Sequence, residues 1–250
     1  MKLILVSDLH LVAPGEKLFG FDPLANLEAC IESINAEHAD ADLVVFCGDI
    51  TNDGLPAAYA AAAEKLKSLR PPYRIMPGNH DDRAALIAAF PEAASGDGFT
   101  HAAIDAGGKR LLLLDTLWPG HVDGQLCDQR LAWIDRELGK TSDALVVMHH
   151  PPFEIGVASM DDCRLTDPDR LLEIFKRHGN VRHIFAGHVH IFASGHWGGI
   201  PFTTLRSTNH QSALAFSGPH RVSFEPPAYH IVLSTNAGIV VHMREFEARR

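Results

Sequence analysis

The feature of this sequence that most restricts its fold is a repeated pairing of a short apolar run with a polar cluster directly after it. Six runs of strand length lie along the chain, at Lys2–Ser7, Asp42–Cys47, Tyr73–Met76, Arg110–Asp115, Ala144–Met148 and Val181–Ala186. Runs that are apolar nearly throughout are typical of strands with both faces covered. Helical patterns lie between them, so the order of elements favours an α/β fold with βαβ units.

Helix start signals fall between these strands. Asp22-Pro23 and Asp167-Pro168 each place a capping residue and a proline at the first turn of a helix, and Asp128 is a third candidate cap. We therefore expect helices over 24–37, 55–69, 129–138 and 169–178, and a further strand over Phe99–Ile104.

The last quarter of the sequence has a different character. From about Ser194 the helical periodicity disappears, and glycine and proline separate strand-like segments at Ile200–Leu205, Tyr229–Ser234 and Gly238–Phe246. We therefore divide the chain into a core over residues 1–193 and a β-rich C-terminal extension over residues 194–250, which is not expected to be an independent domain.

Charge and cysteine content exclude several classes of protein. Lys and Arg total 22 against 31 Asp and Glu, which gives a net charge of −9 and no basic face for nucleic acid or anionic lipid. No apolar run approaches the roughly 20 residues of a membrane span, and the first apolar stretch is too short for a signal peptide. The four cysteines form no Cys-x-x-Cys pair. We expect a cytoplasmic protein with reduced thiols.

Five polar clusters follow five of the apolar runs. They are Asp8-Leu9-His10, Gly48-Asp49, Gly78-Asn79-His80-Asp81, His149-His150-Pro151 and Gly187-His188-Val189-His190. Parallel strands present their carboxyl ends at one edge of a sheet, so these clusters are expected to converge. Aspartate, histidine and asparagine donors suit Fe, Mn, Zn or Co. Seven donors fit two ions that share a bridging carboxylate. The seven candidate donors are Asp8, His10, Asp49, Asn79, His149, His188 and His190.

Taken together and in this order, the five clusters resemble the motifs of the calcineurin-like metallophosphoesterases over roughly residues 2–210. The resemblance implies a four-layer αββα sandwich, in which two packed sheets are flanked by helices. It implies a first metal site at Asp8, His10 and His190, a second at Asn79, His149 and His188, and a bridge through Asp49. In relatives, a metal-bound hydroxide attacks phosphorus in line. His80 matches the family's non-ligand histidine, which stabilises charge or protonates the leaving group.

Departures from the motifs of two branches of this family indicate which branch the sequence resembles. Residues 50–54 lack the arginine of the protein serine/threonine phosphatases, and Asn52 stands where purple acid phosphatases have a tyrosine ligand. Gly15–Phe21, His149–Pro152 and the late His210 instead resemble the class III cyclic-nucleotide phosphodiesterases and their glycerophosphodiesterase relatives. In that branch the histidine matching His210 reaches back to the site. Two divalent ions bound to two carboxylates and one hydroxide would have a net charge of about +1. This charge suits a monoanionic diester substrate.

The branch implies a phosphodiesterase acting on 3′,5′-cyclic nucleotides or glycerophosphodiesters. In similar enzymes the C-terminal extension helps to close the site and builds a dimer interface, so a homo-oligomer, at least a dimer, is expected. The alternatives are a phosphomonoesterase or a nuclease on the same core, or a non-catalytic metal-binding scaffold. The acidic net charge speaks against stable nucleic-acid binding, and no membrane association is expected.

Histidine is the unusual residue in the composition, with sixteen in the chain. His150 is expected to brace its loop, and His178-Gly179 to end a helix. Substrate specificity is expected in the loops around 11–21, 153–165 and 206–220. Eight further histidines are expected to be ordinary core or loop residues: His38, His101, His121, His183, His196, His220, His230 and His242.

Overall fold

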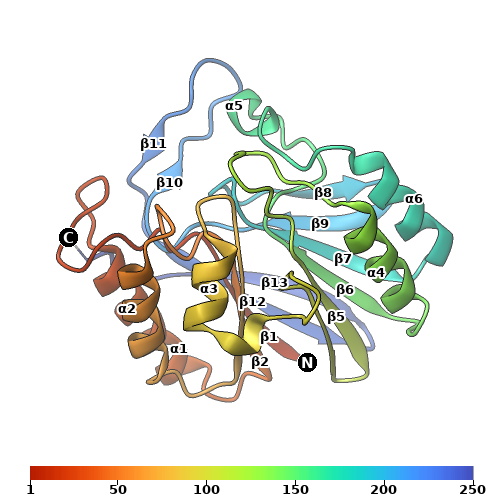
Figure 1. The fold of residues 1–250 in the computed structure, drawn as a ribbon, viewed down its shortest axis with the longest axis horizontal. Coiled ribbons are helices and arrows are strands. Elements are labelled where there is room, and N and C mark those ends of the chain that lie inside the picture. Colours follow the sequence, from red (N-terminus) through yellow and green to blue (C-terminus); the bar gives the residue numbers. More distant parts are fainter. Residues whose placement is uncertain (250) are drawn as a thin grey trace.

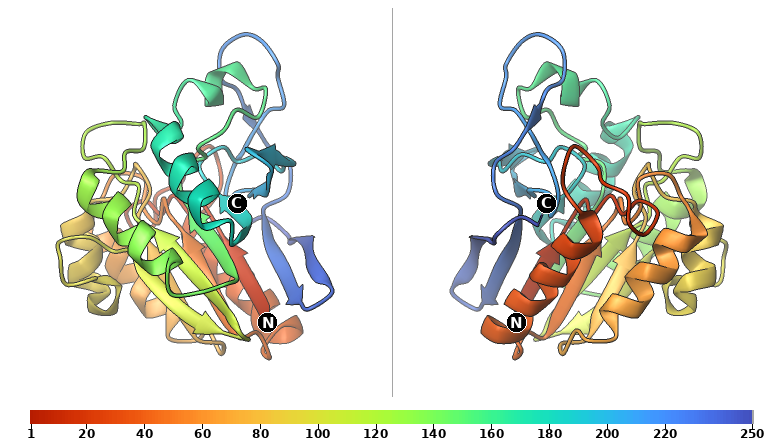
Figure 2. Two further views of the ribbon diagram at one scale, coloured as in Figure 1. Left: turned by 90° about the vertical axis from the view of Figure 1, so that its right-hand side faces the viewer. Right: turned by 90° about the vertical axis from the view of Figure 1, so that its left-hand side faces the viewer.

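The computed structural model describes residues 1–249, in which helices cover the outer sides of two β-sheets (Figures 1 and 2). The first sheet contains β1 (Lys2–Val6), β2 (Leu43–Cys47), β3 (Tyr73–Met76), β12 (Ala228–Thr235) and β13 (Gly238–Glu245), in the order β13-β12-β1-β2-β3. The second contains β4 (Ala102–Ala106), β5 (Lys109–Leu114), β6 (Ala144–Met148), β7 (Val181–Ala186), β8 (Ser194–Trp197) and β9 (Ile200–Thr204), in the order β4-β5-β6-β7-β9-β8. A small ribbon joins β10 (Gln211–Ser212) to β11 (Val222–Ser223).

The helices divide between the two sheets. The first sheet is covered by α1 (Pro23–Glu37), α2 (Pro56–Leu66) and α3 (Arg83–Ala89), with a 3₁₀ turn η1 (Pro91–Ala93) beside them. The second is covered by α4 (Asp128–Leu138) and α6 (Pro168–His178), while the single turn α5 (Ala158–Asp161) lies apart (Figure 1). The expected α/β class, with two sheets and flanking helices, is confirmed.

Successive side chains of a strand point to opposite faces of the sheet, so the first sheet packs against helices on one face and against the second sheet on the other. In β1, Ile4 and Val6 face the helices, whereas Leu3 and Leu5 belong to the core shared with the second sheet. Phe185 of β7 lies in that shared core. Both faces of the central strands therefore bury apolar side chains, which is why their sequences lack polar alternation.

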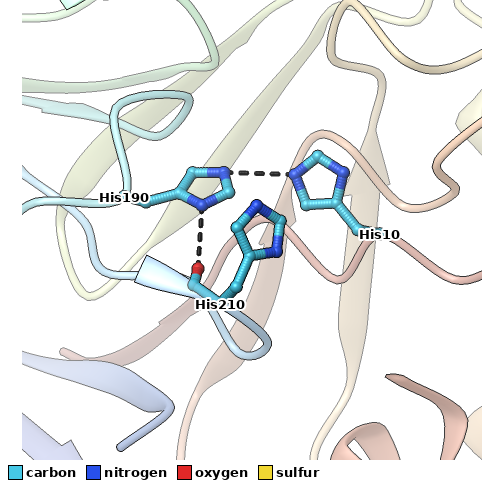
Figure 3. Close-up of side chains that lie close together, drawn as sticks. All are labelled: His10, His190 and His210. Carbon is cyan, nitrogen blue, oxygen red and sulfur yellow. Dashed lines mark hydrogen bonds between the residues drawn. The ribbon is translucent and has the colours of Figure 1, made fainter. Parts of the chain in front are cut away.

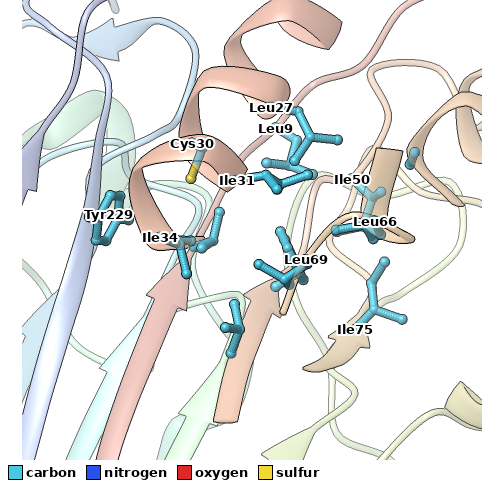
Figure 4. Packing of buried hydrophobic residues seen from close by; sticks show 14 of the residues in the cluster. Leu9, Leu27, Cys30, Ile31, Ile34, Ile50, Leu66, Leu69, Ile75 and Tyr229 are labelled. Carbon is cyan, nitrogen blue, oxygen red and sulfur yellow. The ribbon is translucent and has the colours of Figure 1, made fainter. Parts of the chain in front are cut away.

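The face of α1 against the sheet follows from helical spacing. Leu27, Ile31 and Ile34 are four and three residues apart, so they lie on one side of the helix. They pack with Leu66 of α2 and Ile75 of β3 in one apolar cluster (Figure 4). This cluster fixes the sheet edge from which the loops after β1, β2 and β3 emerge.

Two of the three expected helix caps differ from the sequence-based prediction. Asp22 caps α1 as expected, because its carboxylate accepts a hydrogen bond from Ala25 N at 3.0 Å. Asp167 occupies the N-cap position of α6 as expected, but its backbone is left-handed with φ of 48° and its side chain makes no capping bond. Asp128 is the first helical residue of α4 and not its cap. Capping depends on backbone angles set by the preceding loop, and those are not local sequence properties.

Several short elements were not predicted, and one strand is shifted. The strand expected at Phe99–Ile104 begins at Ala102 and ends at Ala106. No element was predicted for the positions of helix α3, strand β8 or the β10–β11 ribbon. Elements of two to seven residues carry too few positions for a periodic pattern to show.

Strands after residue 193 are members of both sheets. β9 pairs in parallel with β7 and antiparallel with β8, and β12 pairs antiparallel with β1. The contribution of residues 194–250 to an oligomer stays a prediction. No helix within residues 1–249 has the length and apolarity that crossing a membrane requires.

Candidate metal centre

The predicted ligands follow strands of both sheets, and the backbone at most of them is left-handed. Asp8, His10, Asp49, His188 and His190 have φ values of 56°, 48°, 49°, 69° and 52°. Such angles are rare outside glycine and cost about 1–3 kcal/mol each, so they persist only where the surrounding structure fixes them. Each chain segment turns sharply on leaving its strand, and these turns bring the side chains together.

The first group of side chains is His10, His190 and His210, whose candidate ligand atoms lie within 4.8 Å of one another (Figure 3). Nδ1 of His190 donates to the carbonyl oxygen of His210 at 2.9 Å, which leaves Nε2 as the lone-pair nitrogen of the neutral ring. That Nε2 lies 3.1 Å from Nε2 of His10 and 3.3 Å from Oδ1 of Asp8. Nε2 of His10 can donate a hydrogen to this nitrogen, and a metal ion among the three atoms would instead accept their lone pairs.

The second group surrounds His149. Its Nδ1 donates to the carbonyl oxygen of Cys47 at 2.9 Å, so Nε2 again carries the lone pair of the neutral ring. Around Nε2 lie Oδ1 of Asn79 at 3.2 Å, Oδ2 of Asp49 at 3.3 Å and Oδ1 of Asp8 at 4.0 Å. Burial lowers the pKa of His149, but Asp49 and Asp8 outweigh burial and raise it to about 9. A proton is thus favoured where a metal ion would otherwise supply the positive charge.

Asp49 lies between the two groups. Its Oδ2 is 3.3 Å from Nε2 of His149 and 3.7 Å from Nε2 of His10. Burial raises the pKa of Asp49, but His149 and His10 outweigh burial and hold it well below its usual range. The carboxylate is therefore ionised and reaches both groups, which is the position that a bridging ligand requires.

His188 completes the second group. Its backbone N–H donates to both carboxylate oxygens of Asp8 at 3.2 Å, so the left-handed turn at His188 also orients a candidate ligand of the first group. Its ring centroid lies 5.2 Å from that of His149. Burial lowers the pKa of His188 to about 4, which keeps the imidazole neutral and able to bind a metal.

Neighbouring His150 is occupied by other partners. Its Nδ1 lies 2.7 Å from the hydroxyl of Thr116, and its Nε2 lies 3.1 Å from the carbonyl oxygen of Val122. These bonds tie the loops after β5 and β6 together. The contacts match a bracing histidine.

Two glycines of the motifs allow the groups to approach so closely. A Cβ built on Gly78 would lie 2.2 Å from Oδ1 of Asp49 and 2.6 Å from Nε2 of His149. A Cβ on Gly48, whose φ is 95°, would lie 2.4 Å from Nδ1 of His149. Any side chain at either position would displace His149 or Asp49.

Asp81 holds the loops that carry Asp49 and Asn79. Its carboxylate accepts from the backbone N–H groups of Gly78 at 2.9 Å and of Ile50 and Thr51 at 3.0 Å. The hydroxyl of Tyr59 adds a bond of 2.8 Å. This buried acceptor joins the ends of β2 and β3.

The two predicted catalytic histidines lie at the same place. His80 is exposed, its backbone N–H donates to Oδ1 of Asp49 at 2.9 Å, and its ring centroid lies 4.8 Å from that of His10. The ring centroid of His210 lies 5.1 Å from that of His10 and 4.7 Å from that of His190. Burial lowers the pKa of His210 to about 2, so this ring is neutral. The structure thus brings together all nine residues singled out from the sequence.

A cavity of about 150 Å³ lies over this cluster, and several of its lining residues were not predicted. His220, expected to be an ordinary histidine, lines it, and its Nε2 lies 3.0 Å from the hydroxyl of Ser212. Cys163 lies 3.4 Å from Nε2 of His188, and Met160 and Val122 complete the wall. Met160, Cys163, Ser212 and His220 fall in the loops expected to set specificity, but no motif marked them individually.

Comparison with known proteins agrees with this geometry. The sequence profile of the family described as calcineurin-like phosphoesterase matches residues 1–192. A protein of Rhodopseudomonas palustris, named a probable cyclic nucleotide phosphodiesterase, is 37% identical over 98% of this chain and 93% of its own length. The glycerophosphodiester phosphodiesterase GpdQ of Enterobacter lignolyticus is 35% identical over 84% of this chain and 78% of its own.

Solved structures show the same fold at low sequence identity. A dimetal phosphatase from Danio rerio has a TM-score of 0.75 with 16% identity, over 99% of this chain and 97% of that one. The arrangement of two sheets with their helices is therefore shared beyond recognisable sequence similarity.

Proposed function

Since this chain belongs to the calcineurin-like phosphoesterase family, we propose that it is a dinuclear-metal phosphodiesterase for small diesters, either 3′,5′-cyclic nucleotides or glycerophosphodiesters. The observation that carries the proposal is the pair of groups joined by Asp49, in which lone-pair nitrogens face carboxylate oxygens. Relatives named for each of the two substrate classes match most of the chain.

The residues fit two metal ions. Asp8, His10 and His190 would hold one ion, and Asn79, His149 and His188 the other, with Asp49 between them. The donors are neutral imidazoles, an amide oxygen and carboxylates, which suit Fe, Mn, Zn or Co. When bound, two such ions supply positive charge beside the phosphoryl oxygens and lower the pKa of a bound water.

We assign His80 the role of holding a proton for the departing alcohol. Its Nδ1 lies 2.7 Å from the carbonyl oxygen of Asn52, which accepts, so Nδ1 carries a hydrogen and Nε2 is the atom that gains or loses the proton. The ring is exposed and borders both the cavity over the cluster and a larger hollow of about 520 Å³. A protonated Nε2 can therefore meet a leaving oxygen from a substrate lying over Asp49.

We assign His210 the role of a neutral hydrogen-bond donor, and a chain of hydrogen bonds supports the tautomer that this role requires. The backbone N–H of Arg249 donates to Oδ1 of Asn26 at 2.6 Å, so Nδ2 of Asn26 donates to Oδ1 of Asn209 at 3.2 Å. Nδ2 of Asn209 then faces Nδ1 of His210 at 3.4 Å. An amide nitrogen can only donate, so Nδ1 accepts and the hydrogen of His210 sits on Nε2. This N–H can bind a phosphoryl oxygen as negative charge grows there.

Asn209→Asp tests this assignment. Aspartate offers only acceptors, so Nδ1 of His210 must carry the hydrogen, and a neutral ring loses its Nε2 donor. We expect diester turnover to fall about 10- to 100-fold, with metal content unchanged. Asn209→Ser, which can still donate from its hydroxyl, should retain more activity than Asn209→Asp. Equal activity of Asn209→Asp and the wild type would contradict the role of Nε2–H.

The proposed function is tested by measuring metal content together with two hydrolysis rates. Elemental analysis should find near two ions per chain, and bis(p-nitrophenyl) phosphate should be cleaved faster than p-nitrophenyl phosphate, with both rates lost on chelation and restored by metal. Faster monoester cleavage would indicate a phosphomonoesterase. Bound metal without hydrolysis of these esters or of natural diesters would indicate a scaffold, and strong salt-dependent DNA binding a nuclease. The homo-oligomer and the cytoplasmic location stay predictions.

A further inference from the structure

Phe19 occupies a backbone position that is unfavourable for an aromatic residue. Leu18 and Phe21 exchange two backbone hydrogen bonds of 3.0 Å, which closes a tight turn with Phe19 and Gly20 at its centre. Their φ values are 52° and 83°, so both central residues are left-handed. Turns of this kind favour asparagine, aspartate or glycine, because a larger side chain is strained there.

Burial offsets only part of this strain. The Phe19 side chain is 51% exposed, although the neighbouring Phe21 is only 1% exposed. The Phe21 side chain is buried at the end of the turn, and the next residue, Asp22, caps α1. The C-terminal end of the turn is therefore fixed by buried Phe21, while the ring of Phe19 remains partly exposed to solvent.

The exposed ring lies beside the candidate metal centre. Its centroid is 4.7 Å from that of His210, at an angle of 59° between the two planes. Phe224, itself 59% exposed, lies 5.9 Å from Phe21 in centroid distance and extends the apolar surface behind the turn. Phe19 is thus an unfavourable residue for its turn position and gains little burial there. Such local exceptions are expected where a residue has a functional role.

We propose that Phe19 is a specificity-determining residue that stacks against the base of a nucleotide substrate whose phosphodiester lies over Asp49. A phenyl face offers apolar contact to a planar ring and no hydrogen bond to the hydroxyl groups of glycerol. The inference rests on the proposed phosphodiesterase function and narrows its substrate class to 3′,5′-cyclic nucleotides.

The test compares a substrate with a base and one without. Wild type, Phe19→Ala, Phe19→Leu and Phe19→Tyr are assayed on adenosine 3′,5′-cyclic phosphate and on 1,3-propanediol cyclic phosphate, which has the six-membered cyclic diester but no base. p-Nitrophenyl esters are avoided here because their rings can also stack. We expect KM for the nucleotide to rise about tenfold in the alanine and leucine variants, with kcat retained and the tyrosine variant near wild type. The base-free diester should show no change.

Other outcomes would overturn the inference. Equal losses on both substrates would make Phe19 a structural residue of the turn, and no change on either would show that the base lies elsewhere. If the metal-loaded wild type hydrolyses no diester, the proposed function fails, and calorimetric binding of the cyclic nucleotide still decides the role of Phe19. Roughly tenfold weaker binding by Phe19→Ala than by wild type would support stacking, and equal binding would refute it.

Discussion

Asp49→Asn is expected to lose metal and to reduce diester hydrolysis by about 10³-fold or more. Asp49 reaches both groups, at 3.3 Å from His149 and 3.7 Å from His10, and asparagine has nearly the same size without the negative charge. An amide presents one oxygen where the carboxylate presents two. Elemental analysis and the rate on bis(p-nitrophenyl) phosphate give the two readouts.

Asp53→Asn is the matched control for this change. Asp53 is an exposed carboxylate in the loop that follows Asp49, and within residues 1–249 no ion pair to it is found. The same loss of one charge there should leave metal content and rate within about twofold of wild type. Two tightly bound ions in Asp49→Asn would show that Asp49 is not the bridging ligand.

His80→Ala is expected to lower kcat by about 10²- to 10⁴-fold on a diester with an alkyl leaving group, with both metal ions retained. The ring of His80 is exposed, and its Nδ1 is held by the carbonyl oxygen of Asn52, so its removal takes away a proton donor and leaves the candidate ligand side chains in place. p-Nitrophenolate departs readily without protonation. The loss on bis(p-nitrophenyl) phosphate should therefore be much smaller.

This dependence on the leaving group separates acid catalysis from a general disturbance of the site. The control is His242→Ala, which removes another exposed histidine, on β13, and should leave both rates unchanged. Equal losses of His80→Ala on the alkyl and the p-nitrophenyl diesters would contradict protonation of the leaving oxygen. Such a result would assign His80 to stabilising charge on the phosphoryl group instead.

The fold class and the candidate site were readable from the sequence because both depend on local order. An apolar run such as Val44–Phe46 can be buried on both faces of a sheet, and the polar cluster that follows it must lie at the strand's carboxyl end. Eight of the nine residues singled out from the sequence follow such a run, whereas His210 came from the family resemblance, and all nine lie close together in the structure. The motif order carried this information, and the composition alone did not.

Other features depended on partners far away in the chain. β1 pairs with β12, about 230 residues later, and the turn at Phe19 lies beside His210. His220, Cys163 and Met160 enter the cavity from loops with no motif. No short pattern specifies which distant loop will cover a site, because that choice depends on how whole sheets and helices pack.

The sequence by itself determined most of the strands, most of the helices and the identity of the convergent polar side chains, since these follow from periodicity and from the chemistry of each residue. The tertiary structure decided the left-handed turns at Asp8, His10 and Asp49, the tautomer of His210 and the exposure of Phe19. The physical reason is that strained backbone angles and fixed tautomers are held by hydrogen bonds between distant segments. Those bonds exist only after the two sheets have packed together.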